Sequence, residues 1–361
     1  MRVVHVVPAL FGPAGIVGGA ERYALELARH MAAVVPTTLV TFGDTDAEEW
    51  HGPLRVRSLR AWHVRGQRSN PFNAAVLREL LRADVVHCHQ QHVLVSSIAA
   101  AWCRLSGRRV FASDLGGGGW DISAYVATDG WFHGHLHLSE YSRDVFGHRE
   151  NVRARVVGGG VDTDRFAPHA GTPRDGGALF VGRLLPHKGI GDLVRGVPAS
   201  LPLTLVGPRP DPTTEAQIAE WAQGKQLTCC YDLSDEALVE QYRRALCVVL
   251  PSVYRTSASE TKVPELLGQT LLEGMACEAA TVCTRVASMP EIVEDGVTGF
   301  VVPPNDPDML GERLLWLARH RDRARAMGMA GRARALRHFT WSAVVSRCMA
   351  AYTDARAQEA A

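Results

Sequence analysis

Two glutamates, Glu265 and Glu273, stand eight positions apart in the segment PELLGQTLLEGM. Gly268, Gln269 and Thr270 lie between them, and the apolar residues that follow repeat at helical spacing, so the segment predicts a loop that leads into a helix. Backbone N–H groups at a helix start can hold an anion, most often a phosphate. Carboxylates repel phosphate but accept hydrogen bonds from sugar hydroxyls. The pattern predicts a nucleotide-sugar site; the alternative is a surface helix with two solvated glutamates.

A second candidate segment is VGRLLPHKG, in which Arg183 and Lys188 follow an apolar run that ends at Gly182. Ligands of open parallel sheets bind at strand ends, and a diphosphate is the natural partner of two cations there. Arg183 can bind two oxygens at once, while Lys188 supplies a compact charge. Together they can stabilise a departing diphosphate, so no metal ion is expected in this role. The alternative is a pair of exposed cations on a loop.

The N-terminal segment GPAGIVGGAERYA places Gly12, Gly15, Gly18 and Gly19 between an expected strand and an expected helix. The three-glycine spacing of dinucleotide-dependent oxidoreductases is absent, and the loop is too long for that class. Gly18 and Gly19 can instead offer N–H groups to the donor diphosphate.

Composition narrows the class of protein. The 361 residues are 46% hydrophobic, and 39 basic residues against 38 acidic ones give no overall charge that would attract nucleic acid. The eight cysteines contain no C-x-x-C pair and are expected to be reduced core thiols. The start of the chain lacks the pattern of a signal peptide, and no apolar run is long enough to cross a membrane, so we expect a cytoplasmic protein.

Short apolar runs alternate with helical patterns through the chain, as in VVHVVP followed by AERYALELARHMA, and the rhythm restarts at GGALFVGRL. This alternation predicts an α/β protein with two Rossmann-like parallel-sheet domains. The glycine-, proline- and charge-rich segment between them predicts a boundary near Pro168. We therefore expect an N-terminal domain over 1–168 and a C-terminal domain over 169–339, with a final helix in 340–361 that returns to the first domain and packs across both.

Taken together, these motifs resemble those of GT-B glycosyltransferases of the large retaining family, the group 1 or family 4 type. The resemblance covers nearly the whole chain and rests on an ordered series: GGAE at 18–21, DVVHCH at 84–89, SEYSRD at 139–144, VGRLLPHKG, the spaced glutamates, and MPEIVEDGVTGFVVP. It implies two Rossmann-like domains that face each other across a cleft, retention of anomeric configuration, and no required metal or other cofactor.

The resemblance also implies roles for residues. Glu265 contacts hydroxyls of the transferred sugar, Glu273 binds the nucleotide ribose, and Arg183 with Lys188 binds the diphosphate. The backbone around Leu233, in YDLSDEAL, is expected near the base. Gly268, Gln269 and Thr270 complete the donor site.

The chain departs from the family after the run RVFAS, where Asp114 stands in place of a common histidine. Asp114 can accept a proton, stabilise an oxocarbenium-like centre or position the acceptor, and we favour positioning. Its alternative role is to cap a glycine-rich turn. His89, at the end of another expected strand, is a second candidate for acceptor contact. An insertion over 253–264 is either a lid over the donor or an ordinary surface loop.

Two further patterns carry less weight. His87 with His89, and His133, His135 with His137, alternate along expected strands, but no cysteine or carboxylate set accompanies them, so no metal site is predicted. The stretch 52–78 has no acids, and Trp62 and Phe72 lie there beside a series of arginines: Arg55, Arg57, Arg60, Arg65 and Arg68. We interpret it as a solvated face and do not favour peripheral membrane contact.

The sequence thus predicts a retaining, metal-independent glycosyltransferase. It would move a hexose or amino sugar from a UDP- or GDP-type donor to a small-molecule, glycan or lipid acceptor in natural-product or cell-envelope biosynthesis. The alternatives are a GT-B epimerase, a phosphorylase, or a non-catalytic nucleotide-sugar-binding protein. The sequence does not predict the acceptor or the oligomeric state.

Overall fold

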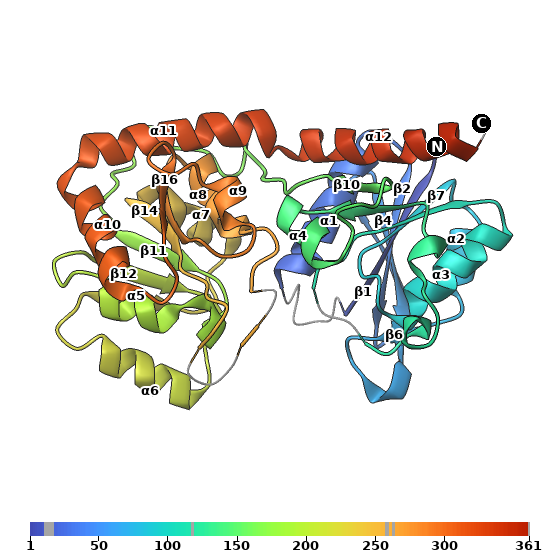
Figure 1. Cartoon of the computed structure of the whole chain (residues 1–361), viewed down its shortest axis with the longest axis horizontal. Helices are drawn as coiled ribbons and strands as arrows, with labels where there is room; N and C mark the ends of the chain where they lie inside the picture. Colours follow the sequence, from blue (N-terminus) through green and yellow to red (C-terminus); the bar gives the residue numbers. More distant parts are fainter. Residues whose placement is uncertain (11–17, 117–118, 257–259, 262–263, 360–361) are drawn as a thin grey trace. The chain divides into compact units, whose positions relative to one another are not determined.

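The structure, a computed structural model, describes residues 1–361 except 11–17, 117–118, 257–259, 262–263 and 360–361 (Figure 1). Gly12, Gly15 and part of the insertion over 253–264 therefore lie outside the described residues. The chain divides into two compact units. Unit 1 comprises Met1–Gly160 with Trp341–Ala361, and unit 2 comprises Val161–Thr340.

Unit 1 is built on an eight-stranded sheet in the order β10-β9-β8-β7-β1-β2-β4-β3. Its strands pair in parallel except β3, which runs antiparallel to β4 at the edge. The strands are β1 (Val3–Leu10), β2 (Thr37–Gly43), β3 (Ala47–His51), β4 (Leu54–Arg60), β7 (Val85–Cys88), β8 (Arg109–Ala112), β9 (Gly134–His137) and β10 (Ala154–Val156). β5 (Trp62–His63) and β6 (Pro71–Phe72) form a separate two-stranded ribbon.

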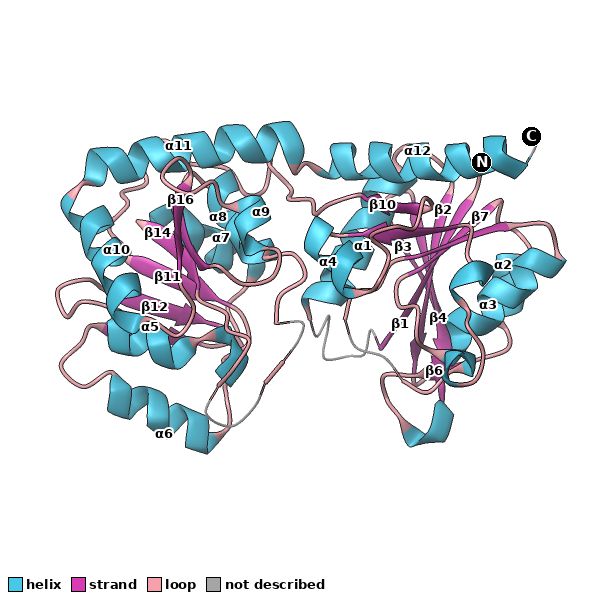
Figure 2. Cartoon of the chain, viewed as in Figure 1, coloured by secondary structure: helices cyan, strands magenta, loops and turns pink. Residues whose placement is uncertain are grey.

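The helices of unit 1 cover this sheet (Figure 2). They are α1 (Gly19–Ala32), α2 (Val76–Leu80), α3 (Leu94–Leu105), α4 (Glu140–Val145) and α12 (Trp341–Glu359), with short 3-10 turns η1 (Val64–Gly66), η2 (Ile122–Ala124) and η3 (Asp129–Trp131). α1 buries Tyr23, Leu27 and Met31, a helical stripe that faces the sheet. α12 packs on α1, β8 and β9, and so belongs to unit 1.

Unit 2 has an all-parallel sheet in the order β13-β12-β11-β14-β15-β16. Its strands are β11 (Ala178–Val181), β12 (Leu203–Val206), β13 (Leu227–Cys230), β14 (Cys247–Leu250), β15 (Ala280–Thr284) and β16 (Gly299–Val302). Its helical segments are η4 (Pro186–Lys188), α5 (Ile190–Gly196), α6 (Pro212–Trp221), α7 (Asp235–Arg244), α8 (Gln269–Ala276), α9 (Met289–Ile292), α10 (Pro307–Arg319) and α11 (Arg321–His338). The predicted α/β class with two parallel sheets is confirmed.

Both sheets reverse their strand order at one point, which fixes where a ligand can bind. In unit 1 the reversal lies between β1 and β7, because β2 follows β1 on one side of the sheet and β8 follows β7 on the other. In unit 2 the reversal lies between β11 and β14. The loops that leave the carboxyl ends of two such neighbouring strands part in opposite directions and leave a crevice. We therefore expect ligands to bind at these two edges.

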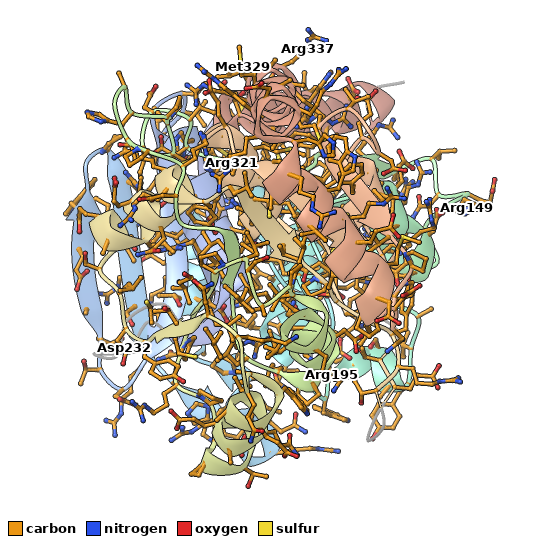
Figure 3. The ribbon with its side chains drawn as sticks, turned by 90° about the vertical axis from the view of Figure 1, so that its left-hand side faces the viewer. Arg149, Arg195, Asp232, Arg321, Met329 and Arg337 are labelled. Carbon is orange, nitrogen blue, oxygen red and sulfur yellow. The ribbon has the colours of Figure 1, made fainter. Side chains whose placement is uncertain are left out.

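α11 is rich in arginine, yet it packs closely on the rest of unit 2. Small and apolar residues, Ala324, Met327, Gly328, Gly331 and Ala335, are buried along one side of the helix, which packs on α8 and β15. Figure 3 shows Met329 and Arg337 directed away from the rest of the unit. Arg332 and Arg334 donate to backbone carbonyl oxygens of unit 2, including those of Ala276 and Ile292, so α11 also holds the end of α8 by hydrogen bonds.

All eight cysteines are described and free, and six of them are buried. Burial raises the pKa of Cys247 to about 12, so this thiol stays protonated. The six buried cysteines are core thiols, as predicted, whereas Cys229 and Cys230 on β13 are half-buried. Among the described helices none has the length and apolar character needed to span a bilayer.

Candidate active site

The strongest predicted pair, Lys188 and Glu265, meets in unit 2. Lys188 Nζ lies 2.5 Å from Glu265 Oε2 and 3.3 Å from the carbonyl oxygen of Pro264. The two side chains are 15% and 16% exposed, so the ion pair is largely sheltered but open at one side. Such a pair keeps a cation and an acid fixed beside each other.

Sheet topology brings these two residues together. Lys188 follows β11 and Glu265 follows β14, and the two strands are neighbours at the point where the strand order reverses. Gly189 makes the close approach possible, since its φ is +70° and a Cβ there would lie 1.9 Å from the carbonyl oxygen of Pro251, just after β14. Only glycine fits this position, and the loop that carries Lys188 is thereby packed onto the end of β14.

The predicted loop before a helix is present at Gly268, which has a φ of +72° and precedes the first residue of α8. Its N–H donates to Glu265 Oε1 at 3.3 Å, so the glutamate is held by both the lysine and the start of the helix. Gln269 and Thr270 form the first turn of α8. Thr270 Oγ1 is covered and has no hydrogen-bond partner among the described residues. A hydroxyl in that state suits a ligand oxygen.

Glu273 lies one turn into α8 and is buried. Its Oε2 accepts a 2.5 Å hydrogen bond from the hydroxyl of Tyr242, at the end of α7. The alternative of a solvated surface glutamate is therefore wrong for this residue. Sequence reasoning missed Tyr242, because its role depends on how α7 packs on α8 rather than on any motif.

Two other predicted donor residues, Arg183 and Leu233, form no side-chain hydrogen bond or ion pair with this cluster in the part of the chain that the structure describes. Arg183 directly follows Gly182 after β11 and is exposed. Burial lowers the pKa of the nearby His187, and the charges of Lys188 and Arg183 lower it further. Leu233 is half-buried between β13 and α7, beside Asp232, which has a φ of 56° and is labelled in Figure 3.

In unit 1, Gly18 immediately precedes α1 in an extended conformation, and no side chain caps this helix. Gly19 is exposed, and a Cβ added there would meet nothing within 4 Å. Donation of these N–H groups of Gly18 and Gly19 to a diphosphate stays a prediction.

Asp114 is buried just after β8, where its Oδ1 accepts from the N–H of Gly116 at 3.1 Å. The carboxylate therefore does cap a glycine turn, which was the alternative interpretation. Burial raises the pKa of Asp114, only partly opposed by the hydrogen bond from Gly116. A carboxyl group whose neutral form is favoured can still position an acceptor hydroxyl, so the two roles are compatible.

His89 faces the core rather than solvent. Its Nε2 lies 2.7 Å from Nδ1 of His5, and its ring stacks on His87. His87 in turn contacts Ser113 Oγ at 2.8 Å and the hydroxyl of Tyr352 at 2.8 Å. Burial lowers the pKa of His5 to about 3, and the pKa values of His87 and His89 also fall well below the usual range. Acceptor contact by His89 stays a prediction.

Two family models match the chain. The model described as "Glycosyl transferases group 1" covers residues 148–334, and the model described as "Glycosyltransferase Family 4" covers residues 17–165. Among curated proteins, alpha-maltose-1-phosphate synthase of Mycobacterium tuberculosis is 26% identical over 315 residues, 75% of this chain and 79% of that protein. A GDP-mannose-dependent alpha-(1-6)-phosphatidylinositol monomannoside mannosyltransferase of Mycolicibacterium smegmatis is 30% identical over 223 residues, 56% of this chain and 58% of that protein.

Solved structures agree on the fold. Sucrose-phosphate synthase from Thermosynechococcus elongatus has a TM-score of 0.76 at 19% identity and covers 99% of this chain and 100% of its own. HepE of Anabaena in complex with UDP-glucose has a TM-score of 0.73 at 16% identity, covering 98% of this chain and 100% of its own. Likeness at this level of identity concerns the fold, and the predicted GT-B class is confirmed.

Proposed function

Because this chain belongs to the glycosyl transferases group 1 family and is a glycosyltransferase, we propose that it transfers a hexose or amino sugar from a UDP- or GDP-type nucleotide-sugar with retention of configuration. UDP-glucose is bound by the similar HepE, and GDP-mannose is named as the donor of a similar mannosyltransferase. Both donor types therefore stay within the proposal, and the test below separates them.

One observation carries the proposal: Lys188, Glu265 and the first turn of α8 converge at the carboxyl ends of β11 and β14. Glu265 would accept hydrogen bonds from the hydroxyls of the sugar, while Lys188 and the α8 amides face the diphosphate. When the bond between the anomeric carbon and the phosphate oxygen breaks, the electron pair goes to the diphosphate. Lys188 and Arg183 would stabilise that charge, and no divalent ion is then needed.

Glu273 would bind the ribose, because a buried carboxylate that is already oriented by a tyrosine needs no rearrangement to accept two hydroxyl donors. The backbone near Leu233, after β13, would contact the base. In unit 1, Gly18 and Gly19 would offer N–H groups to the diphosphate, and Asp114 would position the acceptor hydroxyl. These assignments all use strand ends or helix starts, the positions at which α/β sheets bind ligands.

The acceptor that we would test first is a small polyol or sugar that carries a phosphate. Similar proteins are named for maltose-1-phosphate, D-inositol 3-phosphate and sucrose-phosphate chemistry. A phosphate on the acceptor would add charge-assisted hydrogen bonds that a plain glycan lacks. Natural-product cores, glycans and lipids form the second panel.

The donor is tested by thermal-shift and calorimetric titration with UDP-, GDP-, ADP- and dTDP-sugars, because a ligand that binds the folded state raises its apparent stability. We expect one UDP- or GDP-sugar to bind, and Lys188→Met and Glu265→Gln to weaken binding of that donor. Asp175→Asn is the matched control, since Asp175 forms an exposed ion pair with Arg244 in the same unit. Loss of donor binding in the control, or none in the two variants, would contradict the assignment.

Product analysis separates the reaction classes. We expect transfer to an acceptor with an unchanged anomeric configuration by NMR, at a rate that added Mg²⁺ or Mn²⁺ does not raise. Epimerisation of the donor without acceptor, or cleavage that requires inorganic phosphate, would assign the chain to the other sugar-phosphate chemistries considered above. An inverted product would refute the retaining mechanism.

A further inference from the structure

Unit 1 contains a cluster of two histidines and an aspartate that the proposed transfer reaction does not use. Asp129 lies in η3, His135 in β9, and His148 follows α4. Each of the three offers one ligand atom, and these atoms all lie within 4.8 Å of one another. The rings of His135 and His148 have their centroids 4.0 Å apart. Three separate elements of the fold thus direct metal-ligating groups at one point.

His135 is hydrogen-bonded to the backbone of Asp129, with its Nε2 3.3 Å from the carbonyl oxygen, whereas the carboxylate of Asp129 and the ring of His148 are separated by a distance that suits an ion. His148 Nε2 lies 3.8 Å from Asp129 Oδ2, too far for a hydrogen bond. Zinc bonds of about 2.1 Å at a tetrahedral angle place two ligand atoms about 3.4 Å apart. The carboxylate oxygen and the imidazole nitrogen therefore need to approach each other by only a few tenths of an ångström to share a Zn²⁺ ion.

Neighbouring side chains already orient the ligands. The side-chain amide of Gln91, itself buried, donates to Asp129 Oδ1, which leaves Oδ2 on the side of His148. Nδ1 of His148 shares a 3.0 Å hydrogen bond with Nε2 of His137, which leaves its Nε2 for the cluster. Outer partners that fix the carboxylate and the second ring nitrogen are the usual support of metal-binding side chains.

The cluster is also accessible. Asp129 is 56% exposed, whereas the side chain of His148 is only 7% exposed. An ion can therefore enter past the carboxylate and keep a water molecule as a further ligand, while the imidazoles hold it from below. Imidazole with carboxylate is a ligand set for Zn²⁺ and related transition metals rather than for Mg²⁺ or Ca²⁺.

A second triad in the same unit shows what a histidine cluster without these features looks like. His5, His87 and His89 also have ligand atoms within 4.8 Å, but all three are buried and no carboxylate joins them. His5 and His89 are hydrogen-bonded to each other, and His87 is bonded to Ser113 and Tyr352. Most ring nitrogens of this triad are bonded within the core, although Nδ1 of His89 has no hydrogen-bond partner among the described residues, and the triad serves as an internal comparison.

We propose that Asp129, His135 and His148 form a binding site for Zn²⁺ in unit 1, with Gln91 and His137 as the residues that orient the ligands. The ion would join η3, β9 and the segment after α4, and so stabilise this part of the unit. The donor-binding residues in unit 2 take no part in this site.

The test uses the full chain without a histidine tag, stripped with a chelator and titrated with Zn²⁺ against a chromophoric competitor. We expect one ion per chain, a rise in melting temperature on Zn²⁺ addition, and the visible absorption of low-symmetry Co²⁺ when cobalt replaces zinc. Asp129→Asn is the main variant because its exposed position tolerates an isosteric change, and His148→Gln is the second. Each should lose at least about tenfold in affinity, since even the removal of an outer partner costs about 10–100-fold.

His51→Ala is the matched control, because His51 forms an exposed pair with Glu49 at 3.5 Å, on β3 of the same unit. It should bind Zn²⁺ as the unaltered chain does. Gln91→Leu should weaken binding without removing a ligand. The proposal is overturned if the unaltered chain binds no Zn²⁺, or if Asp129→Asn and His148→Gln bind it as tightly as His51→Ala.

Discussion

Tyr242→Phe removes a single oxygen from the buried support of Glu273. The tyrosine is fully buried, its hydroxyl lies 2.5 Å from Glu273 Oε2, and the glutamate is 3% exposed. A hydrogen bond to a charged group contributes about 1.5–3 kcal/mol, and a buried carboxylate that loses a donor is not resolvated. We expect the variant to lose about 2 kcal/mol of folding free energy in unit 2, or about 4–8 °C in melting temperature for a domain of this size.

The same substitution should weaken donor binding. Phenylalanine preserves the ring that packs edge-on against Phe166 at 5.6 Å, so the change isolates the hydroxyl. If Glu273 binds the ribose, a carboxylate without its orienting donor will accept the two ribose hydroxyls less well, and we expect the Kd of the nucleotide-sugar to rise about tenfold, which corresponds to about 1.4 kcal/mol. Calorimetry of donor binding and thermal unfolding of the same preparation measure the two effects.

Tyr231→Phe is the control. The hydroxyl of Tyr231 reaches Glu215 at 3.3 Å in the same unit, but Glu215 is 39% exposed. Because water can replace the lost hydrogen bond, this variant should change stability by less than about 0.5 kcal/mol, and it controls for stability alone since Tyr231 lies in the segment proposed to contact the base. Equal effects of the two substitutions would refute the reasoning that burial makes the Tyr242 hydrogen bond strong.

Three further predictions concern unit 2 and the core of unit 1. A double-mutant cycle of Lys188→Met with Glu265→Gln should give a coupling energy of about 2 kcal/mol, because this ion pair lies between the exposed and the fully buried kind. A coupling energy near zero would mean that the 2.5 Å contact does not stabilise the fold. Gly189→Ala, whose Cβ would lie 1.9 Å from a carbonyl oxygen, should cost at least about 3 kcal/mol. Gly268 has a similar φ, but a Cβ there would meet only side-chain atoms, those of Leu271 at 3.2 Å and Ile292 at 3.4 Å, so Gly268→Ala should cost about 1–2 kcal/mol. Thermal unfolding that ranks the two variants in the other order would contradict this account. Burial lowers the pKa of His5 to about 3, so the unfolded chain binds a proton that the folded chain rejects. The stability should therefore fall as the pH drops below 6.5, by about 1.4 kcal/mol per pH unit from His5, and the lowered pKa values of His87 and His89 steepen the fall in the same direction; urea unfolding that stays flat between pH 7.5 and 5.5 would exclude this.

Much of the fold could be predicted because the strands of a parallel sheet are apolar on both faces. The runs at Val85–Cys88 and Cys247–Leu250 are buried at every position and are unambiguous in sequence. β3 (Ala47–His51) could not be found in this way, because four of its five residues are exposed and its sequence has no alternating apolar face. It is a strand only because it pairs with β4 at the edge of the sheet.

The donor cluster could be predicted only in part. Lys188 and Glu265 were each assigned to the donor from local motifs, yet the bond between them joins residues 77 positions apart. No local pattern carries that information. It follows from the adjacency of β11 and β14, which is a property of strand order, and from Gly189, whose lack of a side chain lets the loop after one strand lie on the end of the other.

The histidines show why residue spacing alone does not identify a metal site. The alternation of His87 with His89 and of His135 with His137 is the same in sequence, and both sets lie on or beside parallel strands. The first set meets His5 on β1, the register partner of His87, in a cluster to which no described carboxylate contributes, and there His5 and His89 are hydrogen-bonded to each other. The second meets His148 and the exposed Asp129. The exposed carboxylate of Asp129 supplies the negative charge and the entry path that a cation needs. Whether a pair of alternating histidines belongs to the core or to a metal site therefore depends on the residues that neighbouring segments place beside the strand.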